Sequence, residues 1–232
     1  MVFRIIKNKD GYFVENIESK KRYSRHPISE QKAKKQFRIL NKYLTTLEGS
    51  GLNKQEIKQI TRKPLSDLDI RAYIPNAKIL SIPELENYKS IDELLPNDKD
   101  VVFILYPSKP NYGHWVLLAK YGDTIEYNDS YGGKIDEPIT WNTKKQNEYL
   151  DNHKYITNLL TKAQDKYNII YNDKDLQKES PNIANCGRYA IMRALTILND
   201  SQPLEYYNMM LNELKKITGF NYDDIVSGII NI

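Results

Sequence analysis

The chain of 232 residues is long enough to bury a core in one globular domain with an accessory segment. Its one cysteine excludes an internal disulfide framework, and its three histidines show no HExxH-type zinc pattern. The formal charge of +4 is uneven, because residues 1–63 hold 16 Lys and Arg against 6 Asp and Glu. No apolar run approaches the roughly 20 residues that span a bilayer, and the N-terminus lacks the apolar core of a signal peptide.

The first part of the chain predicts a hairpin followed by short helices. Two apolar stretches flank a turn at residues 8–11, which favours a β-hairpin over residues 1–26. Residues 28–47 repeat apolar side chains at helical spacing, with lysines on the other side, so an amphipathic basic helix is expected. Further helices are expected at residues 53–62 and 66–74, and Ser90 opens one more turn. We therefore divide the chain into a mostly helical, basic segment, 1–95, and a core, 96–232.

The basic N-terminal segment has two interpretations of equal weight. Its residues 1–63 carry a net charge of +10, whereas residues 64–232 sum to −6. Such asymmetry is typical of a surface that faces nucleic acid or an acidic protein. The alternative is a lysine-rich helix that is simply well solvated.

The core predicts an α+β fold. Apolar runs at residues 101–107, 111–120 and 123–129 favour a three-stranded antiparallel meander, and residues 167–171 a further strand. Between residues 143 and 166 a long amphipathic helix is expected from a stripe formed by Tyr149, His153, Ile156, Leu160 and Ala163. A helix is expected near residues 204–217, and a short apolar stretch, DDIVSGII, follows at the end. The sequence thus predicts a mixed or antiparallel sheet packed on a central helix, with helical additions at both ends.

That central helix begins near Cys186, in LQKESPNIANCGRYAIMRALTIL. The preceding residues include Pro181 and two asparagines, which cannot extend a helix backwards. Cys186 is therefore expected beside the free N–H groups of a helix N-terminus, where a thiolate is stabilised and the thiol pKa falls below about 8.5. The alternative is a buried, inert cysteine.

Two further residues complete a candidate site for nucleophilic catalysis. His114 begins a central strand, and Asp129 ends the next one. If these strands pair around a turn at residues 121–122, residue numbers that sum to about 243 lie opposite each other, which places Asp129 opposite His114. The carboxylate would then orient the imidazole and leave its other nitrogen for the thiol of Cys186. His26 and His153 are interpreted as ordinary structural or surface residues.

The segments GHWVLL, YNDSYGG and NCGRYAIMR follow in the order His, Asp, Cys, with Gln177 ahead of the cysteine. This arrangement over residues 100–200 resembles the adenain-like and SUMO-protease-like cysteine peptidases, most of all the capsid-maturation proteases of adenoviruses, virophages and related double-stranded DNA viruses. The resemblance implies that His114 is the general base, Asp129 its orienter and Cys186 the nucleophile. It also implies that Gln177 donates to the oxyanion. Because Gln177 lies nine residues before Cys186, either the PNIA spacer loops out or Gln177 is not the donor.

The same resemblance implies a cysteine endopeptidase that processes viral structural precursors after small residues such as glycine pairs. It implies no resident cofactor, with DNA as an activator through the basic N-terminal region, and a place in the host-cell cytoplasm or the virion rather than a membrane. The sequence leaves three alternatives open on the same scaffold: a deubiquitinase, a deSUMOylase or an acetyltransferase. It also leaves open a nucleic-acid-binding module in which Cys186 is structural.

Overall fold

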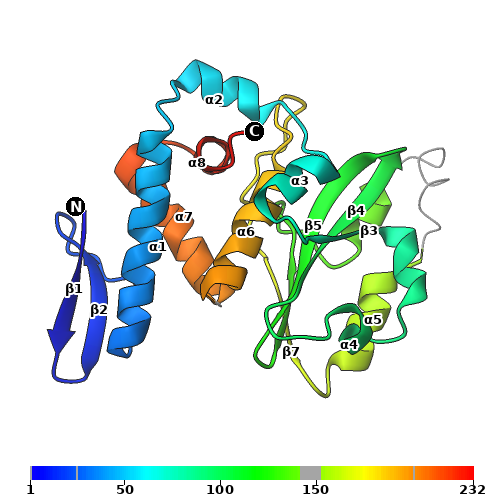
Figure 1. The fold of residues 1–232 in the computed structure, drawn as a ribbon, viewed down its shortest axis with the longest axis horizontal. Helices are drawn as coiled ribbons and strands as arrows, with labels where there is room; N and C mark the ends of the chain where they lie inside the picture. The colour runs from blue at the N-terminus through cyan, green and yellow to red at the C-terminus, as the bar shows by residue number, and fades with distance from the viewer. Residues whose placement is uncertain (1, 25, 142–152, 201) are drawn as a thin grey trace.

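The computed structural model describes residues 2–24, 26–141, 153–200 and 202–232, and its centre is a five-stranded mixed sheet (Figure 1). The strands are β3 (Lys78–Ser81), β4 (Val101–Lys109), β5 (Tyr112–Tyr121), β6 (Thr124–Asn128) and β7 (Asn168–Tyr171), in that spatial order. The central strands β4, β5 and β6 are antiparallel neighbours, whereas β3 and β7 run parallel to β4 and β6. The predicted meander and the predicted mixed sheet are both confirmed.

The edge strand β3 falls in a stretch that the sequence analysis assigned to helices and loops. It has only four residues, all half-buried, and its apolar pattern is too short to indicate a strand. Its pairing with β4 becomes apparent only in the tertiary structure. The division of the chain at residue 95 stays a prediction, and the sheet takes strands from both sides of that position.

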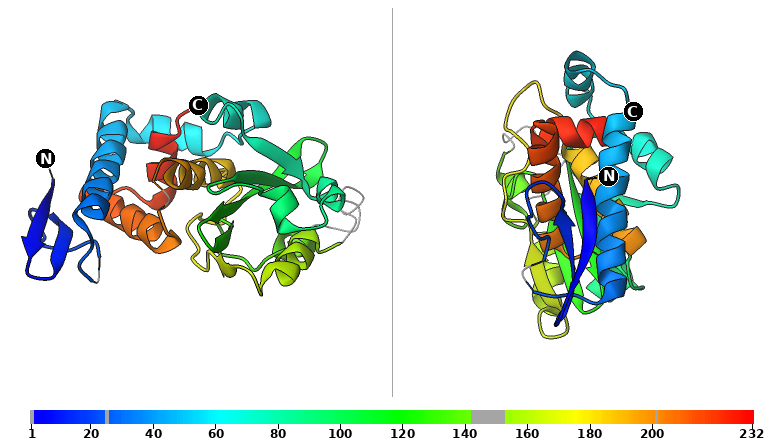
Figure 2. Two further views of the ribbon diagram at one scale, coloured as in Figure 1. Left: turned by 60° about the horizontal axis from the view of Figure 1, so that its bottom comes forward. Right: turned by 90° about the vertical axis from the view of Figure 1, so that its left-hand side faces the viewer.

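Helix α6 (Cys186–Asp200) packs on one face of the sheet, as the sequence predicted for the central helix. Alternate residues of a strand point to opposite faces. On β5, Leu117 and Ala119 therefore join the core with α6, while Val116 and Leu118 join the core on the other face. The other face is covered by η1 (Ile82–Asn87), α4 (Ile91–Leu94) and α5 (Tyr155–Ala163) (Figure 2). The sheet is thus buried on both sides.

The remaining elements lie on the α6 side of the sheet, with the N-terminal hairpin at the far end of the molecule (Figure 1). They are β1 (Phe3–Asn8), β2 (Gly11–Asn16), α1 (Glu30–Gly49), α2 (Lys54–Thr61), α3 (Asp67–Tyr73), α7 (Leu204–Thr218) and α8 (Tyr222–Ile229), and η2 (Glu137–Trp141) follows β6. The predicted hairpin is confirmed, as is the Ser66 cap, whose side chain accepts from the Asp69 N–H. The helical additions at both ends therefore exist as expected.

The long helix expected at residues 143–166 is shorter in the structure. Helix α5 begins at Tyr155, so His153 precedes it and does not belong to its buried stripe. Tyr149 lies outside the described residues. The later part of the predicted stripe is correct, because Ile156, Leu160 and Ala163 are buried.

Candidate active site

Cys186 is the first residue of α6, as its sequence context predicted. Its Sγ lies 3.5 Å from the backbone N of Trp115, which donates to it. The next residue, Gly187, packs so closely that an added Cβ would lie 3.2 Å from the Trp115 ring. The start of the helix therefore packs closely on β5, and the cysteine lies near the N-terminal end of that strand.

The residue before the cysteine is held by the last helix of the chain. Asn185 is fully buried, and its Nδ2 donates to Asp223 Oδ1 at 3.1 Å. Its Oδ1 accepts from the Ser227 hydroxyl at 3.0 Å. Because α8 supplies both partners, it fixes the backbone from which Cys186 projects.

His114 and Asp129 are joined directly. The His114 Nε2 and Asp129 Oδ1 are 2.9 Å apart, and Oδ1 also accepts from the Tyr131 N–H at 2.9 Å. The Asp129 side chain is fully buried, and the His114 side chain is 12% exposed. With Nε2 donating to the carboxylate, Nδ1 is the ring nitrogen left to face Cys186, and the charge of His114 acts on the Cys186 thiol.

The predicted strand register is wrong by two residues. Tyr121 pairs with Thr124 around a two-residue turn, where Gly122 has φ of +58°, so paired residue numbers sum to 245. This register places Asp129 level with Val116, and His114 is its diagonal neighbour on the same face. Diagonal neighbours lie about 7–8 Å apart, a distance that long side chains bridge. The predicted contact therefore forms without the predicted pairing.

The electrostatics of the three residues favour an ion pair. Burial lowers the pKa of the His114 imidazole, but Asp129 and Cys186 outweigh it and raise that pKa from 6.5 to about 10. Burial raises the pKa of the Cys186 thiol, but the hydrogen bond and charge of His114 and two backbone N–H groups bring it below its ordinary value. A thiolate facing an imidazolium is the activated form of a nucleophilic cysteine.

Gln177 lies in the same site, and the spacer before Cys186 loops out between them. Its side chain is buried, its Oε1 accepts from the Ser130 hydroxyl at 2.9 Å, and its Nε2 donates to the Tyr131 hydroxyl at 2.9 Å. Its backbone N also donates to the Ser130 carbonyl. The structure therefore brings all four predicted site residues together.

His114, Gln177 and Cys186 line one cavity of about 240 Å³, and Asp129 reaches it through its contact with His114. Its walls come from the β4–β5 hairpin, η2 and the loop before α6: Pro64, Tyr106, Ser108, Tyr112, Gly113, His114, Tyr131, Pro138, Trp141, Gln177, Ile183, Ala184 and Cys186. Among these described residues there is no Asp, Glu, Lys or Arg. Apart from the His114–Cys186 pair, the cavity walls therefore carry no charged side chain.

Two aromatic residues of this site were not identified from the sequence. The Tyr131 ring stacks on His114 with centroids 5.2 Å apart, and Trp141 tilts against His114 at 5.1 Å. The rings of Tyr131 and Trp141 meet edge to face. Tyr131 stands two residues after Asp129, and that proximity was the one signal that pointed to it.

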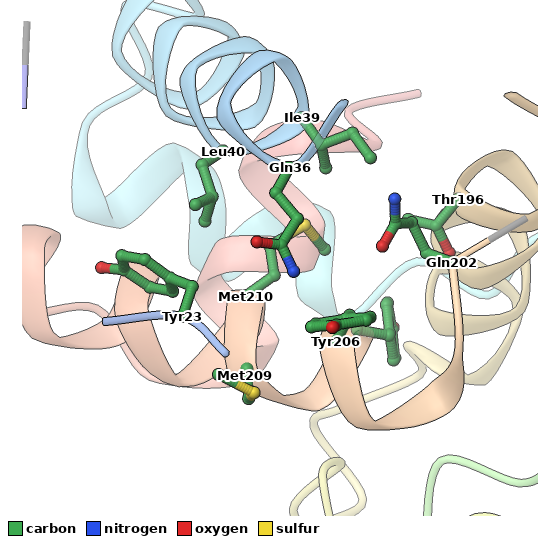
Figure 3. A pocket seen from close by; sticks show the side chains of 10 residues that line it. Tyr23, Gln36, Ile39, Leu40, Thr196, Gln202, Tyr206, Met209 and Met210 are labelled. Carbon is green, nitrogen blue, oxygen red and sulfur yellow. The ribbon is translucent and has the colours of Figure 1, made fainter. Parts of the chain in front are cut away.

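A second cavity lies between α1 and α7 and shares no lining residue with the first (Figure 3). It is small, about 20 Å³, and its walls are largely apolar, with Ile39, Leu40 and Met210 among them. Figure 3 shows the Gln36 amide directed into it. Its lining includes hydroxyl groups of Thr196 and three tyrosines but no Cys or His side chain.

Within the described residues, no group of three or more His, Cys, Asp or Glu side chains is arranged to hold a metal ion. Among the helices that the structure describes, none combines the length and the apolar character needed to cross a membrane.

No family model matches the chain. Among solved structures, the chain is similar to the ASFV pS273R protease, with a TM-score of 0.42, 11% identity, and 88% of this chain and 89% of that chain covered. It is similar to the SUMO protease Ulp1 with a TM-score of 0.33, 20% identity, and 85% and 96% covered. It is 33% identical over 144 residues, 61% of this chain and 81% of the relative, to "Uncharacterized protein V9" of Sputnik virophage. The chain belongs to the family of this virophage protein.

Proposed function

We propose that the chain is a cysteine endopeptidase. The observation that carries the proposal is the placement of Cys186 at the start of α6, in the same cavity as a His114 ring that Asp129 holds at 2.9 Å. A thiol nucleophile, a base and a group that orients the base are the components that covalent acyl transfer requires. Cys186 and His114 line one cavity, and Asp129 holds His114. This grouping supports enzymatic chemistry over a structural role for Cys186.

The proposed reaction begins with the thiolate of Cys186, which attacks a peptide carbonyl carbon. The carbonyl electron pair moves onto oxygen, where the backbone N–H of Cys186 and the Gln177 amide stabilise the charge. His114 then gives its proton to the leaving nitrogen, and the C–N bond breaks. Water attacks the acyl enzyme while His114 takes up its proton, and the thiolate leaves as the carboxylic acid forms.

For the substrate we propose viral structural precursor proteins cut after small residues such as glycine pairs. Kinship with a virophage protein supports a viral context. Apart from His114 and Cys186, the cavity walls carry no Asp, Glu, Lys or Arg, which suits a neutral stretch of polypeptide better than an acidic or basic one. At Gly113 an added Cβ would lie 1.9 Å from the Tyr106 carbonyl oxygen, so this wall is already closely packed.

DNA remains a proposed activator. Four basic side chains of α1 are exposed: Lys32, Lys34, Arg38 and Lys42. An exposed basic helix binds a phosphate backbone in a salt-dependent way. We expect duplex DNA to raise the peptidase rate at low salt and to have no effect at high salt. A rate that changes with neither DNA nor salt would contradict the proposal.

The test is peptide-bond cleavage by the purified chain, followed by mass spectrometry on a peptide library containing small-residue pairs. Cleavage by the wild type and its absence in Cys186→Ala would support the proposal. Parallel assays with ubiquitin and SUMO conjugates, and with acetyl-CoA as a donor, distinguish the alternative activities. A chain that processes none of these, with Cys186 unreactive to iodoacetamide at neutral pH, would contradict it.

A further inference from the structure

Tyr131 contacts three of the four candidate site residues. Its backbone N–H donates to Asp129 Oδ1, and its ring stacks on the His114 imidazole at an interplanar angle of 28°. Its hydroxyl oxygen accepts a hydrogen bond from Gln177 Nε2 at 2.9 Å. One side chain therefore adjoins both the candidate base and the candidate oxyanion donor.

The hydroxyl of Tyr131 keeps an unused donor. A phenol hydroxyl both accepts and donates, and here the oxygen accepts from Gln177. Within the part of the chain that the structure describes, no hydrogen bond donated by this hydroxyl is found. The residue lines the cavity of Cys186 and Gln177, and the charge of the Cys186 thiolate reaches the phenol. The free O–H therefore lies in the site where negative charge would develop.

We propose that Tyr131 is a further catalytic residue, whose phenolic O–H donates a hydrogen bond to the oxyanion beside the Gln177 amide. This inference rests on the proposed function. The two donor atoms are 2.9 Å apart, a spacing at which both can reach one oxygen atom. Ser130 supports the arrangement, because its hydroxyl holds Gln177 Oε1 and so turns the amide NH₂ toward Tyr131.

The hydroxyl donates a hydrogen bond and keeps its proton throughout the reaction. When Cys186 attacks, the carbonyl electron pair moves to the oxygen, and Tyr131 and Gln177 shorten their hydrogen bonds to it. When the intermediate collapses, the pair returns to the C=O bond and the proton for the leaving nitrogen comes from His114. Burial and the neighbouring Cys186 and Asp129 charges raise the pKa of Tyr131 well above its ordinary value, so the phenol stays protonated at neutral pH.

The test is Tyr131→Phe, which removes the hydroxyl and keeps the ring that stacks on His114. Losing one oxyanion donor typically lowers kcat by roughly 100- to 1,000-fold. Because Gln177 and the Cys186 backbone N–H would remain as donors, a smaller fall in kcat of about 10- to 100-fold is expected. KM should stay within about twofold, because the interaction forms in the transition state. Tyr171→Phe, on an exposed tyrosine of β7, is the matched control and should retain wild-type kinetics.

A double mutant distinguishes a Tyr131 that donates directly to the oxyanion from a Tyr131 that only orients Gln177. If Tyr131 only orients Gln177, Tyr131→Phe should have no further effect in a Gln177→Ala background, and this result would overturn the inference. A direct donor predicts a further loss of at least about fivefold. The pH profile of Cys186 alkylation should be the same in Tyr131→Phe and the wild type, which also shows that the site is folded.

Two failures can be told apart. A wild-type chain that cleaves no peptide removes the proposed function and this inference with it. An active wild type with an equally active Tyr131→Phe variant overturns the inference alone.

Discussion

Helix α6 carries two buried polar clusters that differ in how completely their hydrogen bonds are made. At its first residue, Cys186 meets His114 and Asp129 beside an open cavity. Two turns further along, Arg193 meets Glu126 of β6, and both side chains are fully buried. Each cluster joins the same helix to the same sheet.

The Arg193 cluster is satisfied on every side. The guanidinium donates to both Glu126 carboxylate oxygens, at 2.8 and 2.5 Å, and its remaining N–H groups reach Thr196 and the Gln202 carbonyl. Glu126 in turn accepts from the Tyr121 hydroxyl at 2.6 Å. Such a network has no capacity left for a ligand, and its role is to hold α6 on the sheet.

The Cys186 cluster leaves groups unused. Asp129 Oδ2 has no hydrogen-bond partner among the described residues, and the Tyr131 hydroxyl and the Gln177 amide border the cavity. Buried polar groups are normally paired, so unpaired ones mark a place where the protein tolerates a cost. The satisfied cluster therefore holds the fold together, whereas the unsatisfied one keeps polar groups free to bind a ligand.

The largest expected effect is that of Cys186→Ala on turnover. Removing the nucleophile should lower peptidase activity by more than about 10³-fold, because catalysis then lacks its covalent step. Urea unfolding followed by circular dichroism should show little change in stability. A variant that unfolds easily would show that Cys186 has a packing role like that of Arg193.

The opposite pattern is expected for Glu126→Gln. The change leaves the Arg193 charge buried without its partner, which costs about 3–5 kcal/mol in the free energy of unfolding. Urea denaturation measures this loss, and the folded fraction should keep its specific activity. Wild-type stability in this variant would contradict the structural role of the pair.

The ion pair at the site predicts how Cys186 reactivity depends on pH. Iodoacetamide alkylation should stay fast below the ordinary thiol pKa of about 8.5, because His114 lowers the pKa of Cys186. At pH 6.5, His114→Ala should slow alkylation by roughly 10- to 100-fold, since burial alone raises that pKa.

The His114 pKa also predicts a direction for stability. This pKa is raised from 6.5 to about 10, so the stabilising contribution of the imidazolium is complete below pH 6.5 and is lost as the pH rises through 10. The stability difference between the wild type and His114→Ala should shrink over that range. A difference that grows with pH would contradict the assigned ion pair.

The smallest effect is expected for an exposed ion pair. Lys166 lies 2.7 Å from Asp92, and both side chains are well exposed. Solvent screening leaves such a pair with little net stabilisation. Lys166→Gln should therefore leave the midpoint of urea unfolding unchanged, which makes it the control for Glu126→Gln, and a clear drop would show that Asp92 anchors this surface.

Local sequence patterns determined much of this molecule. The break at Pro181 and the apolar run that follows place Cys186 at a helix start, because helix termini are decided by neighbouring residues. Apolar runs likewise located β4, β5 and β6, and the ends of two adjacent strands brought His114 near Asp129. The resemblance of the motifs then added Gln177, which lies at the cavity.

Tertiary structure alone decided the rest. The β5–β6 register depends on which two residues make the turn. The turn lies at residues 122–123, so each residue pairs two positions away from its predicted partner. The pairing of β3 and the contact of Tyr131 with Gln177 join residues 24 or more positions apart, so no local pattern encodes them. Sequence by itself named the groups that could react, because chemistry resides in residue types. Which donors and acceptors of these groups keep no hydrogen-bond partner depends on how distant segments pack together.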